Sequence, residues 1–346
     1  MEHERVVVRK GTRTGLPVII AVHSTALGQA IGGCRVWRYP SWQGGLADAL
    51  RLAEGMTYKA ALAGLAHGGG KSVVAVPPSY QWSAERWVAA MHDVGDAVDE
   101  LGGEYATGPD VGTGPADMVT IGQRTAHVFC KPAEHGGSGN SSAHTATGVL
   151  AALRATCARL YGSESLAGRR FSVVGLGHVG GDIAERLGAA GAELVVSDID
   201  PARKEVAARL GAEWAEPGDA LTAPSDVVVP AALGGVLTAD LVPRLRCRAV
   251  VGPANNQLAE EPVAGLLHER GILWAPDYVV SAGGAINAIS RELHGATADE
   301  ATTRVERIAR TLTDIYARAE STGETPHQAA LSLARATIVE RRTPTA

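Results

Sequence analysis

Three glycines followed by an aspartate carry the clearest chemical signal in the chain. Gly175, Gly177 and Gly180 form a GxGxxG pattern. The pattern directly follows the apolar run of residues 171–174, and Asp198 lies about 20 residues after its first glycine. Such glycines let the backbone turn sharply, approach a pyrophosphate and pack against the next helix, whose first N–H groups bind phosphate. The spacing therefore predicts a dinucleotide site.

The aspartate decides between two dinucleotides. A carboxylate at the position of Asp198 accepts hydrogen bonds from ribose hydroxyls and repels a 2′-phosphate. Asp200 adds to this repulsion, whereas Arg203 opposes it. We therefore expect NAD rather than NADP as the cofactor, bound by the glycine turn together with His178 and Val179.

Two lysines and an aspartate in the first third of the chain are candidates for proton transfer. Lys71 follows three glycines and precedes an apolar run, a place where a side chain enters a cleft. A phosphate loop is excluded, because GxxxxGK[ST] requires a glycine six residues before the lysine, where Leu65 stands. Lys59, on a predicted helix, and Asp110, in a turn rich in glycine, are by themselves typical of a solvated lysine and a turn-forming carboxylate.

The first half of the chain predicts elements that position these residues. The β-branched residues 5–8 and 17–23 flank a turn-forming stretch and predict a hairpin. Apolar residues at helical spacing predict helices over residues 45–62 and 83–101. Between the helices, residues 73–76 predict a strand.

The second half predicts a parallel, doubly wound α/β sheet, because short apolar runs alternate there with helical segments. In such a sheet a ligand lies outside the carboxyl ends of the strands, so the loops with Ala231, Ala232 and Asn255 would line the cofactor site. The predicted strands lie near residues 171–174, 194–197, 227–229, 249–251 and 272–274, after a helix over residues 143–161.

Length and composition fit a two-domain globular protein. The 346 residues exceed one comfortable core, and we place a first domain at residues 1–139, a cofactor domain at 140–297 and C-terminal helices at 298–346 that pack back across both. A net charge of −5 gives no electrostatic reason to expect nucleic acid or a membrane as partner. The four cysteines form no CxxC pair, so we expect no metal site and a cytoplasmic protein with reduced thiols.

Several motifs in a fixed order add a family resemblance over nearly the whole chain. The chain resembles the amino-acid dehydrogenases that act on leucine, valine, phenylalanine and glutamate. This resemblance implies an N-terminal α/β substrate and oligomerisation domain, a Rossmann-type domain and a homo-oligomer with an even number of subunits. The GGGK form and the short length are similar to the branch that acts on apolar amino acids. The motifs are IGGCRVWRY, EGMTYKAALAGLAHGGGKSVV, TGPDVGT, VVGLGHVGG, GPANNQL and APDYVVSAGGAI.

The resemblance also implies roles for single residues. Lys59 would bind the substrate carboxylate, Lys71 would be the catalytic lysine, and Asp110 the acid that works with it. Asn255 would hold the carboxylate beside the nicotinamide ribose, and Thr145 would reach the carboxamide. The expected reaction is the reversible, NAD-dependent oxidative deamination of an L-amino acid, and it needs no metal because the hydride chemistry belongs to the cofactor.

The side-chain pocket implied by the resemblance predicts the substrate. Ala285 and Ala288 stand where branched-chain enzymes carry valines, and the extra room favours a bulky, aromatic substrate such as phenylalanine or tryptophan, with some overlap with leucine. Ser281 replaces a family asparagine, so a contact near the cofactor would be lost or bridged by water. The implied pocket consists of Ile31, Gly32, Met56, Gly108, Ala285 and Ala288, with Ile289 nearby.

Three other interpretations stay open from the sequence. A branched-chain dehydrogenase, or one that acts on a non-protein amino acid, would keep the fold and change the substrate. A cofactor-binding protein without activity would keep the scaffold alone, although the lysine pair and Asp110 argue against it.

Overall fold

The computed structural model describes residues 3–342, which form two compact units. Unit 1 contains residues up to Asn140 and takes in two later segments, residues 288–296 and the chain from Ala334. Unit 2 contains the segments 141–287 and 297–333. Within residues 3–342, every helix is too short or too polar to cross a lipid bilayer.

Unit 1 is built on a mixed five-stranded sheet with the order β1-β2-β4-β3-β5. The predicted hairpin is confirmed, since β1 pairs antiparallel with β2, and β3 runs parallel to both β4 and β5. The strands are β1 (Arg5–Lys10), β2 (Pro17–Ser24), β3 (Ala30–Arg38), β4 (Gly68–Val76) and β5 (Tyr105–Pro109), and the helices are α1 (Trp42–Leu62), α2 (Ala84–Asp99) and α3 (Pro115–Ile121).

The central strand β4 is buried on both faces, because α1 packs on one side of the sheet and α2 on the other. Val73 and Ala75 pack with Ala49 and Ala53 of α1, whereas the alternate residues of β4 face the core under α2. By the same alternation Lys71 shares the α1 face. The strand therefore directs its lysine and its neighbouring serine to opposite sides.

The three glycines before Lys71 are strand residues, so the strand begins earlier than residues 73–76 indicated. A Cβ built on Gly69 would lie 2.1 Å from the backbone nitrogen of Thr57 in α1. Only a residue without a side chain lets helix and strand approach this closely. Packing thus overrides the poor strand propensity of glycine here.

A buried carboxylate joins α2 to the turn of the hairpin. Asp93 of α2 accepts hydrogen bonds from the N–H groups of Arg13 and Thr14 at 3.1 and 3.0 Å, and from the Thr14 hydroxyl at 2.7 Å. Burial opposes its ionisation, but these donors and the Arg13 guanidinium outweigh burial and lower the pKa of Asp93. The hairpin turn is therefore held by one ionised side chain.

We expect Asp93→Asn to lower the free energy of unfolding by about 3 kcal/mol at neutral pH, because the amide presents an N–H group to donors that need an acceptor. The pKa of Asp93 is lowered in the folded state, so its stabilisation is full above the usual aspartate range and is lost as the pH falls through the folded value. Urea unfolding at neutral and acidic pH measures both effects. Asp99→Asn, at the exposed end of the same helix, serves as the control and is expected to change nothing.

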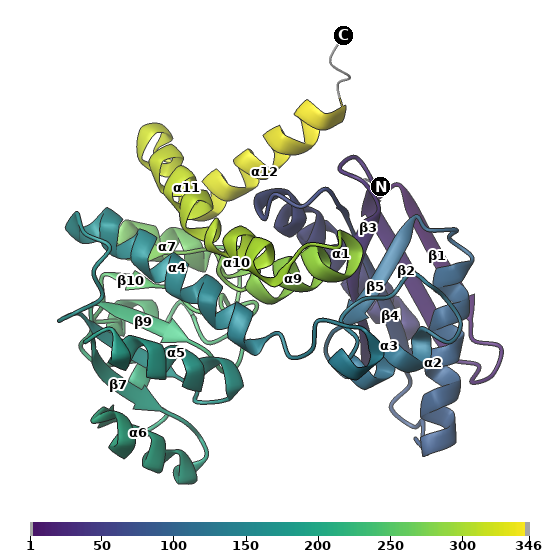
Figure 1. Ribbon diagram of the computed structural model, residues 1–346, viewed down its shortest axis with the longest axis horizontal. Helices are drawn as coiled ribbons and strands as arrows, with labels where there is room; N and C mark the ends of the chain where they lie inside the picture. Colours follow the sequence, from purple (N-terminus) through teal and green to yellow (C-terminus); the bar gives the residue numbers. More distant parts are fainter. Residues whose placement is uncertain (1–2, 343–346) are drawn as a thin grey trace. The chain divides into compact units, whose positions relative to one another are not determined.

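Unit 2 contains an all-parallel six-stranded sheet with the order β11-β10-β9-β6-β7-β8, which confirms the doubly wound topology. From β6 the chain winds outward to β8, and from β9 it winds the opposite way to β11. Because crossovers between parallel strands are right-handed as a rule, this winding puts α5 (His178–Ala189) and α7 (Val263–Glu269) on opposite faces of the sheet (Figure 1). The strands are β6 (Arg170–Val174), β7 (Glu193–Ser197), β8 (Glu213–Trp214), β9 (Val227–Pro230), β10 (Ala249–Val250) and β11 (Leu273–Trp274).

The helices of unit 2 and of the chain beyond it follow the predicted helical segments, with α4 running from Ser142 to Tyr161. A short π-helical turn, Ile289–Leu293, continues α9 and was not predicted. The remaining helices are α5 (His178–Ala189), α6 (Lys204–Leu210), α7 (Val263–Glu269), α8 (Asp277–Val280), α9 (Gly283–Ala288), α10 (Ala298–Glu306), α11 (Ile308–Thr322) and α12 (Pro326–Arg342).

Candidate active site

Unit 1 brings Lys71 and Asp110 together, as their predicted joint role requires. The Lys71 Nζ lies 2.9 Å from the Asp110 Oδ2, and only 5% of the lysine side chain is exposed. Lys71 comes from β4, and Asp110 directly follows β5, whose partner β3 separates the two strands. The pair therefore connects two strands that are not neighbours in the sheet.

The two ionised groups have shifted pKa values for a clear physical reason. Burial lowers the pKa of Lys71 because the charged amine loses water, and the attraction of Asp110 offsets this only in part. Burial alone would raise the pKa of Asp110, but the neighbouring cations Lys71 and Arg35 outweigh it, so the pKa is lowered. These shifts favour an ionised Asp110 carboxylate and make the Lys71 ammonium group easier to deprotonate.

An arginine that the sequence analysis did not select completes this cluster. The Arg35 Nε donates to the same Asp110 Oδ2 at 2.8 Å, and its Nη1 donates to Asp48 at 2.8 Å. Asp48 in turn accepts from the Tyr39 hydroxyl and from Arg51, each at 2.7 Å. A sequence feature that could have indicated this role is the position of Arg35 inside the apolar run that forms β3, where a charged side chain needs a partner.

The glycine turn of unit 2 has the geometry that a dinucleotide needs. Gly175 has a φ of +105°, which favours glycine, and a Cβ on Gly180 would lie 2.0 Å from the Gly175 carbonyl oxygen. Apart from Gly177 itself and its two chain neighbours, no atom of the described residues lies within 4 Å of a Cβ built on Gly177, the residue that precedes α5. The turn is therefore tight where helix and strand meet and open where a pyrophosphate would approach, so these residues fit NAD.

Asp198 and the loop after β9 lie beside this turn. Asp198 follows β7 and accepts the Leu176 N–H at 2.7 Å, which ties the aspartate to the glycine turn. The backbone nitrogen of Ala232 lies 3.0 Å from a Cβ built on Gly175, and the Cβ of Ala231 lies 3.0 Å from one built on Gly180. The predicted cofactor residues thus converge at the carboxyl ends of β6, β7 and β9.

A buried glutamine shapes the loop that carries Asn255. Gln257 is fully buried, donates to the Gly252 carbonyl at 2.7 Å and accepts from the Trp274 indole at 3.1 Å. Its backbone N–H donates to Asp277 at 2.7 Å. These hydrogen bonds hold the loop in one conformation. The spacing of residues in the motif GPANNQL gave no indication of this role for Gln257.

Two further predicted residues lie near α9. The Ser281 hydroxyl donates to the Asn255 Oδ1 at 3.2 Å, so the serine that departs from the family pattern keeps a contact with this asparagine. The Thr145 Oγ1 lies 2.8 Å from a Cβ built on Gly284, and it donates to the Ser141 carbonyl at 3.0 Å. The AGG motif therefore permits the close packing of α9 on the start of α4.

Family models match both units. The model described as Glu/Leu/Phe/Val dehydrogenase, dimerisation domain, matches residues 3–127, and the glutamate/leucine/phenylalanine/valine dehydrogenase model matches residues 196–343. The phenylalanine dehydrogenase of Lysinibacillus sphaericus is 40% identical over 92% of this chain and 84% of its own length. The chain belongs to the glutamate, leucine, phenylalanine and valine dehydrogenase family.

Other similarities of this family member agree with that assignment. The valine dehydrogenase of Streptomyces coelicolor is 41% identical over 98% of this chain and 93% of its own length. The crystal structure of L-tryptophan dehydrogenase from Nostoc punctiforme is 35% identical, with a TM-score of 0.87 over 99% of this chain and 97% of that chain. An NAD-binding domain model of D-isomer specific 2-hydroxyacid dehydrogenases also matches residues 148–243. The chain is an NAD-dependent amino-acid dehydrogenase.

The residues predicted to bind substrate in this dehydrogenase lie on several elements. Lys59 and Met56 lie half-buried on α1, Gly32 and Gly108 are buried in β3 and β5, and Ala285 and Ala288 are on α9. The two glycines serve packing, because a Cβ on Gly32 would lie 1.8 Å from the Gly70 carbonyl oxygen and one on Gly108 would lie 2.6 Å from the ring of Phe129. Their roles toward substrate, like those of Lys59 and Met56, stay predictions.

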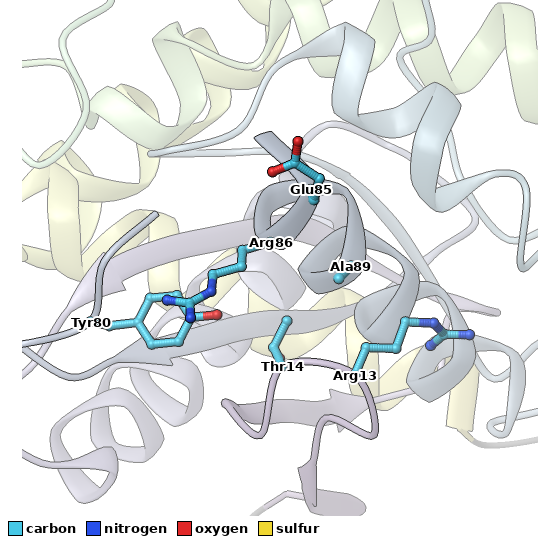
Figure 2. A pocket seen from close by; sticks show the side chains of 6 residues that line it. All are labelled: Arg13, Thr14, Tyr80, Glu85, Arg86 and Ala89. Carbon is cyan, nitrogen blue, oxygen red and sulfur yellow. The ribbon is translucent and has the colours of Figure 1, made fainter. Parts of the chain in front are cut away.

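A separate surface hollow of the dehydrogenase shares no residue with the Lys71 cluster. Figure 2 shows Arg86 lying over the ring of Tyr80, with the guanidinium carbon 5.5 Å from the ring centroid. Arg13 on the other side is already paired with Asp93 and Asp96. Both arginines of the hollow therefore already have partners within the protein, and we assign the hollow no part in the reaction.

Proposed function

We propose that this dehydrogenase oxidatively deaminates a bulky, aromatic L-amino acid such as phenylalanine or tryptophan, with Lys71 and Asp110 as its proton-transferring residues. The observation that carries the proposal is the buried ion pair of these two side chains, 2.9 Å apart. Oxidation of an amine at its α-carbon needs a base, and burial lowers the pKa of Lys71, so this lysine gives up its proton more readily than a solvated one.

The residues of unit 1 have distinct tasks in this proposal. The ammonium group of Lys59 pairs with the substrate carboxylate. Lys71 in its neutral form accepts a proton from the substrate ammonium group, and later directs the attack of water on the substrate imine. Asp110 stabilises the cation that develops at the amine and relays its proton. Water replaces ammonia at the α-carbon, which leaves the 2-oxo acid.

The residues of unit 2 hold and orient the cofactor. The cofactor NAD would supply the acceptor for the hydride of the substrate α-carbon. The turn at Gly175 and Gly177, with the start of α5, would bind the pyrophosphate. Asp198 would accept hydrogen bonds from the ribose hydroxyls. Asn255 holds the substrate carboxylate in place, and Thr145 binds the carboxamide.

A panel of L-amino acids tests the function and the substrate together. Formation of the reduced cofactor is followed by absorbance with phenylalanine, tryptophan, leucine, valine and glutamate, each with NAD and with NADP. We expect the highest kcat/KM with an aromatic substrate and NAD. A best rate with leucine or valine would contradict the pocket argument alone, whereas the absence of turnover with all five would contradict the proposed substrates.

Ala285→Val tests the pocket directly. Ala285 is half-buried on α9, and two added methyl groups would take room from a large substrate side chain. We expect the ratio of kcat/KM for phenylalanine over valine to fall by about tenfold, since one to two methylene-sized groups decide about 1–3 kcal/mol of discrimination. Ala143→Val is the matched control, because it adds the same two methyl groups at an exposed position at the start of α4, outside the predicted pocket. An unchanged ratio in Ala285→Val would remove this residue from the pocket.

Assembly and location complete the proposal. The dimerisation-domain match and the edge position of β1 support a homo-oligomer, in which an open strand edge would pair with a second copy. Light scattering of the purified protein measures the subunit number, for which we expect an even value.

The free thiols of the four cysteines and the ordinary charge support a cytoplasmic protein, which fractionation of cells would test.

A further inference from the structure

Asp110 receives two cations on one oxygen atom. Lys71 Nζ and Arg35 Nε lie 2.9 and 2.8 Å from the same Oδ2. Asp110 favours the charged form of Lys71, whereas the positive charge of Arg35 on the same oxygen opposes it. The arrangement therefore bears on how firmly Asp110 holds the lysine in its charged form.

The arginine is itself held from behind. Asp48 accepts from the Arg35 Nη1, from Tyr39 and from Arg51, and the side chains of Arg35 and Asp48 are only 15% and 17% exposed. A planar guanidinium with two carboxylate partners has a fixed orientation, because each N–H group points along one direction. Arg35 thus presents its Nε to Asp110 in one defined geometry.

We propose that Arg35 is a positioning residue of this dehydrogenase. It orients the Asp110 carboxylate and offsets part of the negative charge that Lys71 experiences, so that Lys71 is able to give up its proton. The inference rests on the proposed function of Lys71 as a base. It adds a residue that acts on Lys71 in two ways, through the orientation of Asp110 and through its own positive charge.

A test of this proposal must distinguish the effect of Arg35 on Lys71 from the effects of the other ionisable groups nearby. The nearby ionisable groups whose charges bear on Lys71 are Asp110, directly after β5, and Arg35 and Cys34 of β3. Burial raises the pKa of the Cys34 thiol to about 12, so the thiol is neutral at working pH. The elements β2 and α1, which pack against β4, carry His23, Asp48, Arg51, Glu54, Tyr58 and Lys59. The opposite face carries Glu85, Arg86, His92, Asp93, Asp96 and Asp99 on α2.

The titration of Lys71 in the full-length protein tests the proposal without any need for turnover. The chain has five lysines, so a protein labelled with carbon-13 at the lysine Cε gives few NMR signals, and Lys71→Met identifies the one from Lys71. In Arg35→Met the carboxylate of Asp110 has Lys71 as its remaining cation, so we expect the titration of Lys71 to move up by about 1 to 2 pH units. The acid limb of kcat/KM should move by the same amount.

Three variants separate charge from structure. Arg51→Met is the matched control, since Arg51 also bonds to Asp48 and has no bond to Asp110 among the described residues; we expect the titration of Lys71 to stay in place. Arg35→Lys keeps the charge and should restore most of the wild-type titration with a lowered kcat. If Arg35→Met does not fold, Arg35→Gln removes the charge while keeping a hydrogen-bond donor, and it should give the same upward shift.

The outcomes are distinct. A titration of Lys71 that is unchanged in Arg35→Met or Arg35→Gln would overturn the proposal, as would a uniform loss of kcat/KM with no movement of the acid limb. A wild-type protein that turns over no amino acid would contradict the proposed function, and the NMR comparison would still decide whether Arg35 controls the proton of Lys71.

Discussion

Lys71→Met is expected to lower kcat for the preferred amino acid by about 10²- to 10⁴-fold, the range that a positioned acid–base group contributes. Methionine has a similar length, so it fills the space on β4 and removes only the amine. Without the amine no group at this position accepts the substrate proton. Steady-state kinetics with saturating NAD and amino acid measures the loss.

The fold and the cofactor site are internal controls for this variant. Lys71 belongs to unit 1, and the glycine turn belongs to unit 2, so the dissociation constant of NADH measured by fluorescence should not change. Removal of one partner from a buried ion pair destabilises the fold, but Asp110 keeps Arg35 as a cation at 2.8 Å, so we expect a thermal midpoint only slightly below the wild-type value. Retained turnover in Lys71→Met would show that a different group serves as the base.

Gly180→Ala is expected to weaken NAD binding by about 10²-fold. The added Cβ would lie 2.0 Å from the Gly175 carbonyl oxygen, so the turn and the start of α5 must separate by about 1 Å. This displaces the N–H groups that bind the pyrophosphate. Titration of NADH fluorescence measures the affinity.

The next glycine is the matched control. A Cβ on Gly181 would lie 3.5 Å from the Leu176 carbonyl oxygen, an ordinary contact, so Gly181→Ala should leave the affinity for NADH unchanged. Alanine also has the better helix propensity, and the variant is expected to be slightly more stable. Equal losses in both variants would show that the helix tolerates no added methyl group and would contradict the specific role of Gly180.

Local features of the chain were predictable because their signals lie close together in the sequence. The glycine turn, the strand before it and Asp198 are parts of one βαβ unit, and the structure places them as expected. The predicted start of the helix at residue 83 is likewise confirmed, since the Ser83 hydroxyl caps α2 and accepts the Arg86 N–H at 3.2 Å. Such interactions span a few residues, and composition and spacing are sufficient to find them.

Features that depend on strand order were not predictable in the same way. The bond between Arg35 and Asp110 joins residues 75 positions apart, and it exists because β3 lies between β4 and β5. The two-residue strand β8 is too short to show an alternation. Gln257 has its partners around it only after the loop and α8 fold together. Tertiary packing decides these features, and the chain alone does not display it.

The alternation of β4 has a consequence for how this enzyme can change. Both faces of the strand are buried, and successive residues point to opposite faces. Loss or gain of one residue before Lys71 would turn the lysine toward the core under α2 and bring Ser72 to the α1 face. Length variation within this strand would therefore remove the reactive amine and disrupt the core in one event. Diversification of the enzyme has to proceed here by substitution, whereas insertions and deletions are confined to its loops.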